Sequence, residues 1–288
     1  MSEAPISVQK LAKDIYVEST FTGVTVGAIV TAAGVICIDT PTSPADARRW
    51  RLKLAQLSDE PIQFVVNLDH HRDRVLGNAW FEAPVIAHDL TYERVKLLPE
   101  MFKGSLSEAG ADSDLVPDLV GVRFVPPQIT FADRMTLVKG GYEINLVHRP
   151  GVNPGAVWVE LPAQQIVFTG DAVTNGAPPL MQEADLDAWL EGLAEMQKKK
   201  FPAKVIVPGR GAPTDKAGVK TAEDFLKLVR RKVEGLVRAK KTRSDAAALA
   251  EDLLEHFTTP HALREHYTRR LRAGLEHVFD TVAVPVKK

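Results

Sequence analysis

The sequence predicts an α+β protein whose first part mixes strands with helices and whose last part is helical. Apolar and β-branched runs typical of strands recur from the N-terminal region up to residues 205–207. Amphipathic segments with helical spacing lie between these runs. Beyond Pro213 no strand-like run occurs, and the composition shifts near residue 215. We therefore divide the chain into a domain at 1–215 and a C-terminal helical extension at 216–288.

The N-terminal half is predicted to alternate short strands with helices. Ser43 as N-cap and Pro44 at the first helical position indicate the start of a helix that Pro61 ends. Thr91 is expected to cap a second helix, which reaches Leu98. The strand-like runs of this half are residues 15–17, 24–31, 35–38, 64–66 and 85–87.

The second half is predicted to contain two hairpins, a helix and a final strand before the tail. Residues 102–119, rich in Gly, Ser and Asp, are expected to form an insertion or a lid. Gly140-Gly141 indicates a tight hairpin turn. Lysines at 198–200 suit the last turn of a helix. The predicted elements are strands at 135–138, 142–147, 157–161, 165–168 and 205–207, and helices at 185–200, 222–240, 244–257 and 260–279.

Composition excludes several classes of protein. With 288 residues, 45% hydrophobic and 25% charged, the chain is neither disordered nor collagen-like. A formal charge of -1 provides no global field for nucleic acid or an anionic membrane. Cys37 is the only cysteine, which excludes a disulfide within the chain. Because neither a signal peptide nor a membrane span of about 18 apolar residues is found, a cytoplasmic location is expected.

The polar loop after the strand at 64–66 carries the most informative motif. It resembles the His-x-His-x-Asp-His loop of the metallo-β-lactamase superfamily, which also follows a strand ending in Asn and precedes a Gly-Asn pair. On that frame His71 and Asp73 match, whereas Asp69 stands for the first His and Arg74 for the last. The full stretch is Val65-Val66-Asn67-Leu68-Asp69-His70-His71-Arg72-Asp73-Arg74-Val75-Leu76-Gly77-Asn78.

Two further segments resemble the same family in its order. Residues 35–40 (Val-Ile-Cys-Ile-Asp-Thr) are similar to its early apolar strand ending in Asp-Thr. Residues 149–156 (Arg-Pro-Gly-Val-Asn-Pro-Gly-Ala) resemble its Pro-Gly-His-Thr-Pro-Gly-Ser loop, with Val152 in place of the metal-binding His.

The last two segments complete the resemblance. Residues 166–171 keep the family's Phe-Thr-Gly-Asp with the bridging carboxylate, Asp171, and residues 207–211 keep Pro-Gly-x-Gly but have Arg210 where a His belongs. Together the motifs span roughly residues 10 to 215. The resemblance implies a four-layer αββα metallo-β-lactamase-like sandwich with a C-terminal helical extension such as some members carry.

The substitutions imply a degenerate metal site. In an intact member His and carboxylate ligands hold two zinc ions, and a metal-bound hydroxide attacks a carbonyl or phosphoryl centre. Valine has no lone pair to donate, and arginine stays protonated at any relevant pH. Val152, Arg74 and Arg210 therefore cannot bind zinc through their side chains. A fourth ligand position is altered to Asp69.

The loss of metal ligands differs between the two metal positions that the resemblance implies. One position still offers Asp69, His71 and Asp171, a set that suits a single Zn, Mn or Fe ion. The other contains Arg74 and Arg210, whose charges would repel a metal. The expected cofactor is therefore either none or one divalent metal at a single site.

Charge arithmetic suggests what fills the second position. Two neutral histidines and one dication carry the same charge as two arginines. We hypothesise that the guanidiniums of Arg74 and Arg210 occupy the vacated volume and pair with Asp73 and Asp171. If they are not fully neutralised, the two arginines could instead bind a carboxylate or phosphate ligand.

Several histidines lie near these motifs or in the tail. His148, four residues before Val152, could be a general base, a substitute ligand or a hydrogen-bonded structural residue. Asp73 is the other candidate base. His70 is expected to point away from the site. Three tail histidines are expected at the surface or between helices: His256, His261 and His266.

Two main functions remain open from the sequence. The first is a metal-free or metal-poor divergent member, a pseudoenzyme candidate acting as a small-molecule binder or a non-standard hydrolase. The second is a mononuclear metal-dependent hydrolase of an ester, thioester or lactone that uses Asp69, His71 and Asp171. The expected partner is a small molecule, anionic ligands included, rather than nucleic acid or membrane. The amphipathic tail could also serve a homo-oligomer, and a purely structural role built on it has no positive support.

Overall fold

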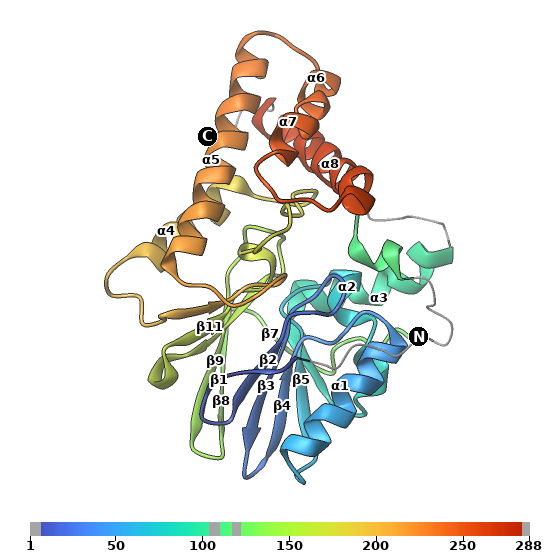
Figure 1. Ribbon diagram of the computed structural model, residues 1–288, viewed down its shortest axis with the longest axis vertical. Coiled ribbons are helices and arrows are strands. Elements are labelled where there is room, and N and C mark those ends of the chain that lie inside the picture. Colours follow the sequence, from blue (N-terminus) through green and yellow to red (C-terminus); the bar gives the residue numbers. More distant parts are fainter. Residues whose placement is uncertain (1–6, 104–109, 117–121, 284–288) are drawn as a thin grey trace.

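The computed structural model describes residues 7–103, 110–116 and 122–283, without the side chains of 99–103. Two sheets pack face to face between outer helices (Figure 1). The first sheet comprises, in spatial order, β1 (Gln9–Ala12), β2 (Ile15–Glu18), β3 (Val26–Thr31), β4 (Gly34–Ile38), β5 (Ile62–Val66), β6 (Val85–His88) and β7 (Ile129–Phe131). The second comprises β12 (Val205–Val207), β11 (Ile166–Phe168), β10 (Val157–Leu161), β9 (Tyr142–His148) and β8 (Arg134–Lys139).

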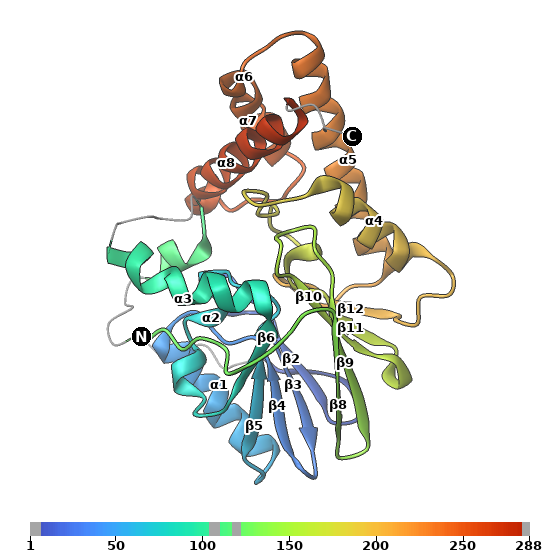
Figure 2. The same ribbon diagram turned by 180° about the vertical axis from the view of Figure 1, so that it is seen from behind.

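Helices cover both outer faces of this pair of sheets and then form the tail (Figure 2). Two lie on the side of the first sheet, α1 (Pro44–Leu57) and α3 (Asp89–Lys103), and the short α2 (Arg72–Val75) follows β5. The remaining helices are α4 (Leu186–Gln197), α5 (Lys216–Arg238), α6 (Arg243–Ala248), α7 (Ala250–Leu254) and α8 (Arg264–Ala283). The predicted αββα sandwich with a helical extension is confirmed. None of the described helices is long and apolar enough to cross a membrane.

Three large apolar clusters hold the layers together. Between the sheets, side chains of the first sheet such as Ile36 pack against side chains of the second such as Phe168. Outside the first sheet, the fully buried Trp50 of α1 fills the space over β3 and β4. The third cluster joins Trp158 of β10 to Leu275 of α8, so the helical extension shares one core with the second sheet. Each such fully buried large side chain contributes about 1.5–3 kcal/mol.

Local sequence signals predicted the start of one helix correctly and the start of another wrongly. Ser43 caps α1 as predicted, since its Oγ accepts a hydrogen bond from the backbone N–H of Asp46 at 3.0 Å. Thr91 does not cap α3, because the helix begins at Asp89 and the ring Nδ1 of His88 accepts the N–H of Leu90.

Two predictions for later helices are also wrong. Helix α4 ends at Gln197, so the lysines at 198–200 follow the helix instead of forming its last turn. The predicted helix at 244–257 is interrupted at Leu249 and forms α6 and α7. Of the predicted insertion or lid at 102–119, residues 104–109 and 117–119 lie outside the described residues.

The turn between β8 and β9 agrees with its sequence signal. Gly140 and Gly141 have φ values of +52° and +86°, a left-handed backbone that matches the twist of a two-residue hairpin. The hairpin extends the second sheet to its outer edge at β8.

Candidate functional site

The site lies where four strands end. β4 and β5 are parallel neighbours in the first sheet, and β11 and β12 are parallel neighbours in the second. Asp39 follows β4, the polar loop at 67–74 follows β5, Asp171 follows β11, and Arg210 lies just beyond β12. Because the carboxyl ends of parallel neighbours meet at one edge of a sheet, the fold gathers these polar residues between the two sheets.

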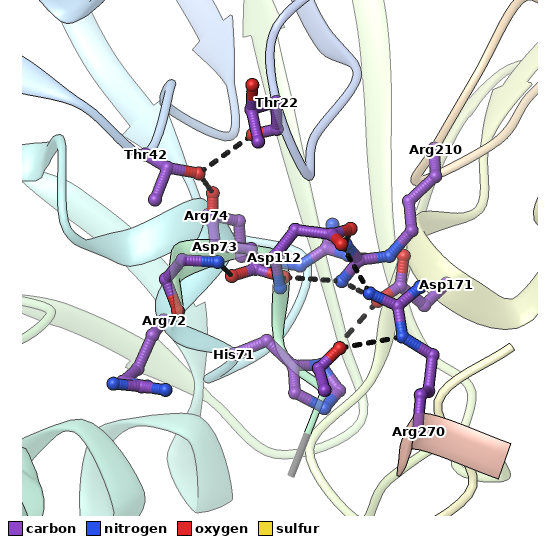
Figure 3. Close-up of polar contacts among 12 residues, drawn as sticks. Thr22, Thr42, His71, Arg72, Asp73, Arg74, Asp112, Asp171, Arg210 and Arg270 are labelled. Carbon is purple, nitrogen blue, oxygen red and sulfur yellow. Dashed lines mark hydrogen bonds and ion pairs between the residues drawn. The ribbon is translucent and has the colours of Figure 1, made fainter. Parts of the chain in front are cut away.

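Buried amide and hydroxyl groups fix the loop after β5. The backbone carbonyl of Arg74 accepts hydrogen bonds from Thr40 Oγ1 at 2.8 Å and Asn67 Nδ2 at 3.1 Å. Asn78 Nδ2 in turn donates to Asn67 Oδ1 at 2.7 Å. These contacts explain why the loop motif is framed by asparagines. They hold Arg74 toward the cluster, whereas Arg72 points away from it (Figure 3).

Arg74 is fully buried and is surrounded by carboxylates. Its Nη1 lies 2.6 Å from Asp39 Oδ2, its Nε 2.8 Å from Asp69 Oδ1, and its Nη2 2.6 Å from Asp171 Oδ1. The expected pair with Asp171 is therefore present. The other expected partner, Asp73, is not among its described contacts, and Asp39 and Asp69 are paired instead.

Arg210 occupies the opposite side of Asp171. Its Nη2 lies 2.9 Å from Asp73 Oδ2 and 3.0 Å from Asp171 Oδ2, which are the two partners that the sequence predicted. Its Nη1 also pairs with Asp112, a residue outside the family motifs. Figure 3 shows these four side chains converging from different segments of the chain.

Asp112 connects the site to the helical extension. Its Oδ1 accepts a hydrogen bond from Arg270 Nη2 at 2.6 Å and lies 3.1 Å from His266 Nε2, and both partners belong to α8. The backbone N–H groups of Asp112 and Ser113 donate to the carboxylate of Asp73, at 3.1 and 2.6 Å. The extension is thus tied to the same ion-pair network as the strand ends.

Sequence motifs do not reveal this part of the network. Asp112 lies within the segment predicted to be an insertion or a lid, and no motif includes Arg270. His266, expected at the surface or between helices, is 3% exposed and contacts Asp112 at the start of the short 3-10 helix at 112–115. The buried guanidinium of Arg270 also donates to the carbonyls of Gly110 and Pro178, at 2.8 and 3.1 Å. The available signal was a His and an Arg four residues apart, and therefore on one face, of an amphipathic helix.

The arginines decide which carboxyl groups are ionised. Burial by itself raises a carboxyl pKa, but guanidinium charges outweigh it at most positions of the network. Asp39 is the exception, since burial raises its pKa to about 7 and Arg74 offsets this only in part. In Asp69, Asp171 and Asp112, nearby positive charges hold the carboxyl pKa below its ordinary range. Arg74 is the main such charge for Asp69, and Arg210 is the main one for Asp171 and Asp112.

Arginines supply most of the positive charge in this network. Three buried guanidiniums, those of Arg74, Arg210 and Arg270, face five carboxyl groups, those of Asp39, Asp69, Asp73, Asp112 and Asp171. His71 Nδ1 lies 3.2 Å from Asp69 Oδ1 and 3.7 Å from Asp171 Oδ2, and His266 Nε2 contacts Asp112. Buried carboxylates are tolerated only when they are compensated by charge or hydrogen bonds, and the arginines provide both.

The residues at the family's metal-ligand positions include side-chain types that suit one metal ion, but they suit a dinuclear centre poorly. Asp69, His71 and Asp171 can each offer one ligand atom, and these atoms lie within 4.8 Å of one another. However, Arg74 contacts both carboxylates of this set. Val152 is buried within the apolar cluster of the extension and offers no ligand atom. At the other position that the family implies, Arg74 and Arg210 offer no lone pair to a metal.

The other predicted site residues lie at different places. His148 ends β9, with its Nε2 2.8 Å from the carbonyl of Pro154 and its ring stacked on His88 at 3.8 Å between centroids. Its described contacts do not include the carboxylate and arginine network. His70 is buried, and its Nε2 lies 3.4 Å from Glu183 Oε2. Burial raises the pKa of Glu183, but the contacts with His70 and Arg94 outweigh burial and lower this pKa to about 2.

A pocket of about 540 Å³ opens on the Arg210 side of the network. Arg210 and Asp112 form part of its wall, together with the aromatic rings of Phe21 and Tyr267. Tyr267 belongs to α8, so the helical extension contributes directly to this pocket. The volume lies within the ~300–1,000 Å³ that small-molecule pockets usually have.

The comparisons with known proteins assign the family. The sequence model of the metallo-beta-lactamase superfamily matches residues 19–231, which is most of the chain. The chain therefore belongs to the metallo-beta-lactamase superfamily, whose members bind divalent metals.

Among individual proteins, the chain is similar to a linear primary-alkylsulfatase of Pseudomonas sp. (strain ATCC 19151), with 22% identity over 229 residues. The match covers 68% of this chain but only 43% of that relative, so the chain spans less than half of its length.

Solved structures of low identity show the same fold. The stereoselective inverting sec-alkylsulfatase Pisa1 from Pseudomonas sp. aligns with a TM-score of 0.69 and 16% identity, over 96% of this chain and 50% of that one. A metallo-beta-lactamase family protein from Thermus thermophilus aligns with a TM-score of 0.68 and 18% identity, over 94% and 95%. A metallo-beta-lactamase from Pontibacter korlensis aligns with a TM-score of 0.61 and 20% identity, over 77% and 99%.

Proposed function

We propose that this chain is a metal-independent member of the superfamily that binds a small molecule over its arginine and carboxylate network. The observation that carries the proposal is the buried guanidinium of Arg74, within 2.8 Å of Asp69 and 2.6 Å of Asp171. These are the carboxylates that a metal ion would need. A dication bound to the same groups would be repelled by the guanidinium in a region where screening is weak.

The pocket beside Arg210 is the proposed ligand site. Arg210 lines this pocket, and its buried Nε has no hydrogen-bond partner among the described residues, so an acceptor on a ligand that reaches Nε would satisfy this donor. The rings of Phe21 and Tyr267 offer flat apolar surface nearby. A small aromatic or apolar molecule with a carboxylate, a phosphate or a similar acceptor group fits this combination.

Metal loading tests the proposal most simply. The purified chain is incubated with zinc or manganese, exchanged into metal-free buffer and analysed for bound metal by mass spectrometry. We expect well under one ion per chain, in the wild type and in Asp69→Asn alike. About one ion per chain in the wild type, lost in Asp69→Asn, would overturn the proposal.

A mononuclear metal-dependent hydrolase is the second candidate. It is favoured by one observation, the group of Asp69, His71 and Asp171 with potential ligand atoms within 4.8 Å. The substrate in that case would be an ester, a thioester or a lactone, or a sulfate ester by similarity to the alkylsulfatases. In that case a bound metal would supply the activated water, and Asp73 or His148 would act as base.

An activity assay distinguishes this candidate. Hydrolysis of 4-nitrophenyl acetate and 4-nitrophenyl sulfate is measured with zinc or manganese and with a chelator. Activity that requires metal and disappears in His71→Ala would favour the hydrolase. Equal background rates in the wild type and in His71→Ala would exclude it.

A further inference from the structure

A second pocket lies between the helical extension on one side and α4 with the segment 172–179 on the other. Its volume is about 530 Å³, and it shares no lining residue with the pocket beside Arg210. It lies against α5, the end of α7, and the chain around 172–179, near the place where α4 and α5 run side by side (Figure 2). Six residues with mainly apolar side chains form much of its lining: Ala172, Pro179, Trp189, Phe225, Leu228 and Phe257.

Among the described residues, the polar side chains of Thr174 and Trp189 at the inner surface of this pocket already have hydrogen-bond partners. The one polar atom of Trp189, its Nε1, already donates to the carbonyl of Ala172 at 2.9 Å. Phe225 packs edge-on against Phe257 with 4.9 Å between ring centroids, so the aromatic wall is internally supported. An occupant of this space therefore gains from burying apolar surface and has no hydrogen bonds to replace.

The rim of the pocket carries one unpaired cation. Arg231 is exposed, lines the pocket, and has no ion pair or hydrogen bond within the described chain. The neighbouring charges are already engaged, because Arg230 pairs with Asp187 and the lining residue Asp224 pairs with Lys220. The rim therefore has one available positive charge and no competing free carboxylate from Asp224.

We propose that this pocket binds a free, single-tailed amphiphile with an anionic head. The alkyl tail lies on the apolar inner surface, and the head group contacts Arg231. A pocket of this volume accommodates a medium-length chain, because drug-sized ligands bind in about 300–1,000 Å³. An exposed guanidinium matches the geometry of a carboxylate or a related anion. The proposal is independent of whether the carboxylate network holds a metal.

The pocket also adjoins the segment that supports the Arg210 site. Thr174 lines it, and the backbone of Thr174 bridges that of Arg210. Asn175 N–H donates to the Arg210 carbonyl at 2.9 Å. A bound amphiphile would therefore contact the segment that holds Arg210, and it should raise the melting temperature of the whole domain.

Titration calorimetry with the full chain tests the proposal. We expect saturable one-to-one binding of decanoate, stronger by up to about fourfold per methylene from octanoate to dodecanoate until the pocket is filled. Ala222→Phe, which places a ring at a lining position, should abolish binding. Arg231→Gln should weaken decanoate about fivefold and leave decanol unchanged. Lys232→Gln, with the same charge change at a position that does not line the pocket, should match the wild type.

Other outcomes would overturn the assignment. They include no saturable binding of decanoate, equal affinity in the wild type and Ala222→Phe, or binding to anionic vesicles alone. Concentration-dependent dimerisation that Ala222→Phe abolishes, without decanoate binding, would assign the surface to a second copy of the chain. Circular dichroism checks that Ala222→Phe is folded, and Thr221→Trp at the exposed rim gives a second blocking variant.

Discussion

Replacing Arg74 with methionine tests whether its guanidinium compensates the buried carboxylates. Methionine keeps a long apolar stem but removes the charge, leaving Asp39, Asp69 and Asp171 without their contacts at 2.6–2.8 Å. Removing one partner of a buried ion pair costs about 3–5 kcal/mol, because the other partner stays buried and uncompensated. At about 2–4 °C per kcal/mol, a loss near the middle of that range lowers the melting temperature by about 8–16 °C.

Urea unfolding followed by circular dichroism measures this loss. The control is Arg51→Met, because Arg51 pairs with Glu82 at an exposed position and such pairs contribute about 0–1 kcal/mol. Adding Asp69→Asn to Arg74→Met should recover part of the lost stability, since it removes one uncompensated charge. An Arg74→Met protein within 1 kcal/mol of the wild type would refute the compensation by Arg74.

Three more predictions concern the same network. The pKa of Asp112 is held below its ordinary 3.8, so its contribution to stability is complete above about pH 4 and is lost as the pH falls through the folded value. The unfolding free energy of Asp112→Asn should therefore fall less steeply below pH 4 than that of the wild type. If the two proteins lose stability equally steeply below pH 4, the ion pairs of Asp112 do not make this contribution. Arg270→Met should cost about 3–5 kcal/mol in urea unfolding, and a cost below 1 kcal/mol would mean that its three contacts are dispensable. The triple variant Val152→His, Arg74→His and Arg210→His should gain zinc in equilibrium dialysis, whereas retention equal to the wild type would contradict the ligand assignment.

Much of the fold follows from local patterns. β-branched and apolar runs bounded by glycine turns correctly indicated most strands of both sheets, but β1 and β7 lie outside the predicted runs. Errors arose where tertiary contacts replaced a local signal. Thr91 looked like a cap, but its hydroxyl donates to the carbonyl of Gly155 at 3.1 Å, and His88 takes the capping role.

The site was predictable only in part. Motif positions indicated that Arg210 would face Asp171, because each follows a strand at the same edge of the sheet. No local pattern could indicate that Asp112 and Arg270, 158 positions apart, meet beside them. Asp39 was noticed only as the end of a strand, yet its φ of +56° bends the backbone there and its Oδ1 accepts the N–H of Leu68. Contacts of this kind depend on how separate elements pack.

Thermal unfolding with chelator and with added zinc tests the central claim most directly. A metal ion that binds only the folded chain, at 100 times its dissociation constant, would add about 2.7 kcal/mol to the stability. If Arg74 and Arg210 have taken over the charge of the missing metal, the melting temperature will be the same in EDTA, in buffer and in micromolar zinc. A melting temperature that falls in EDTA and is restored by zinc would contradict the account.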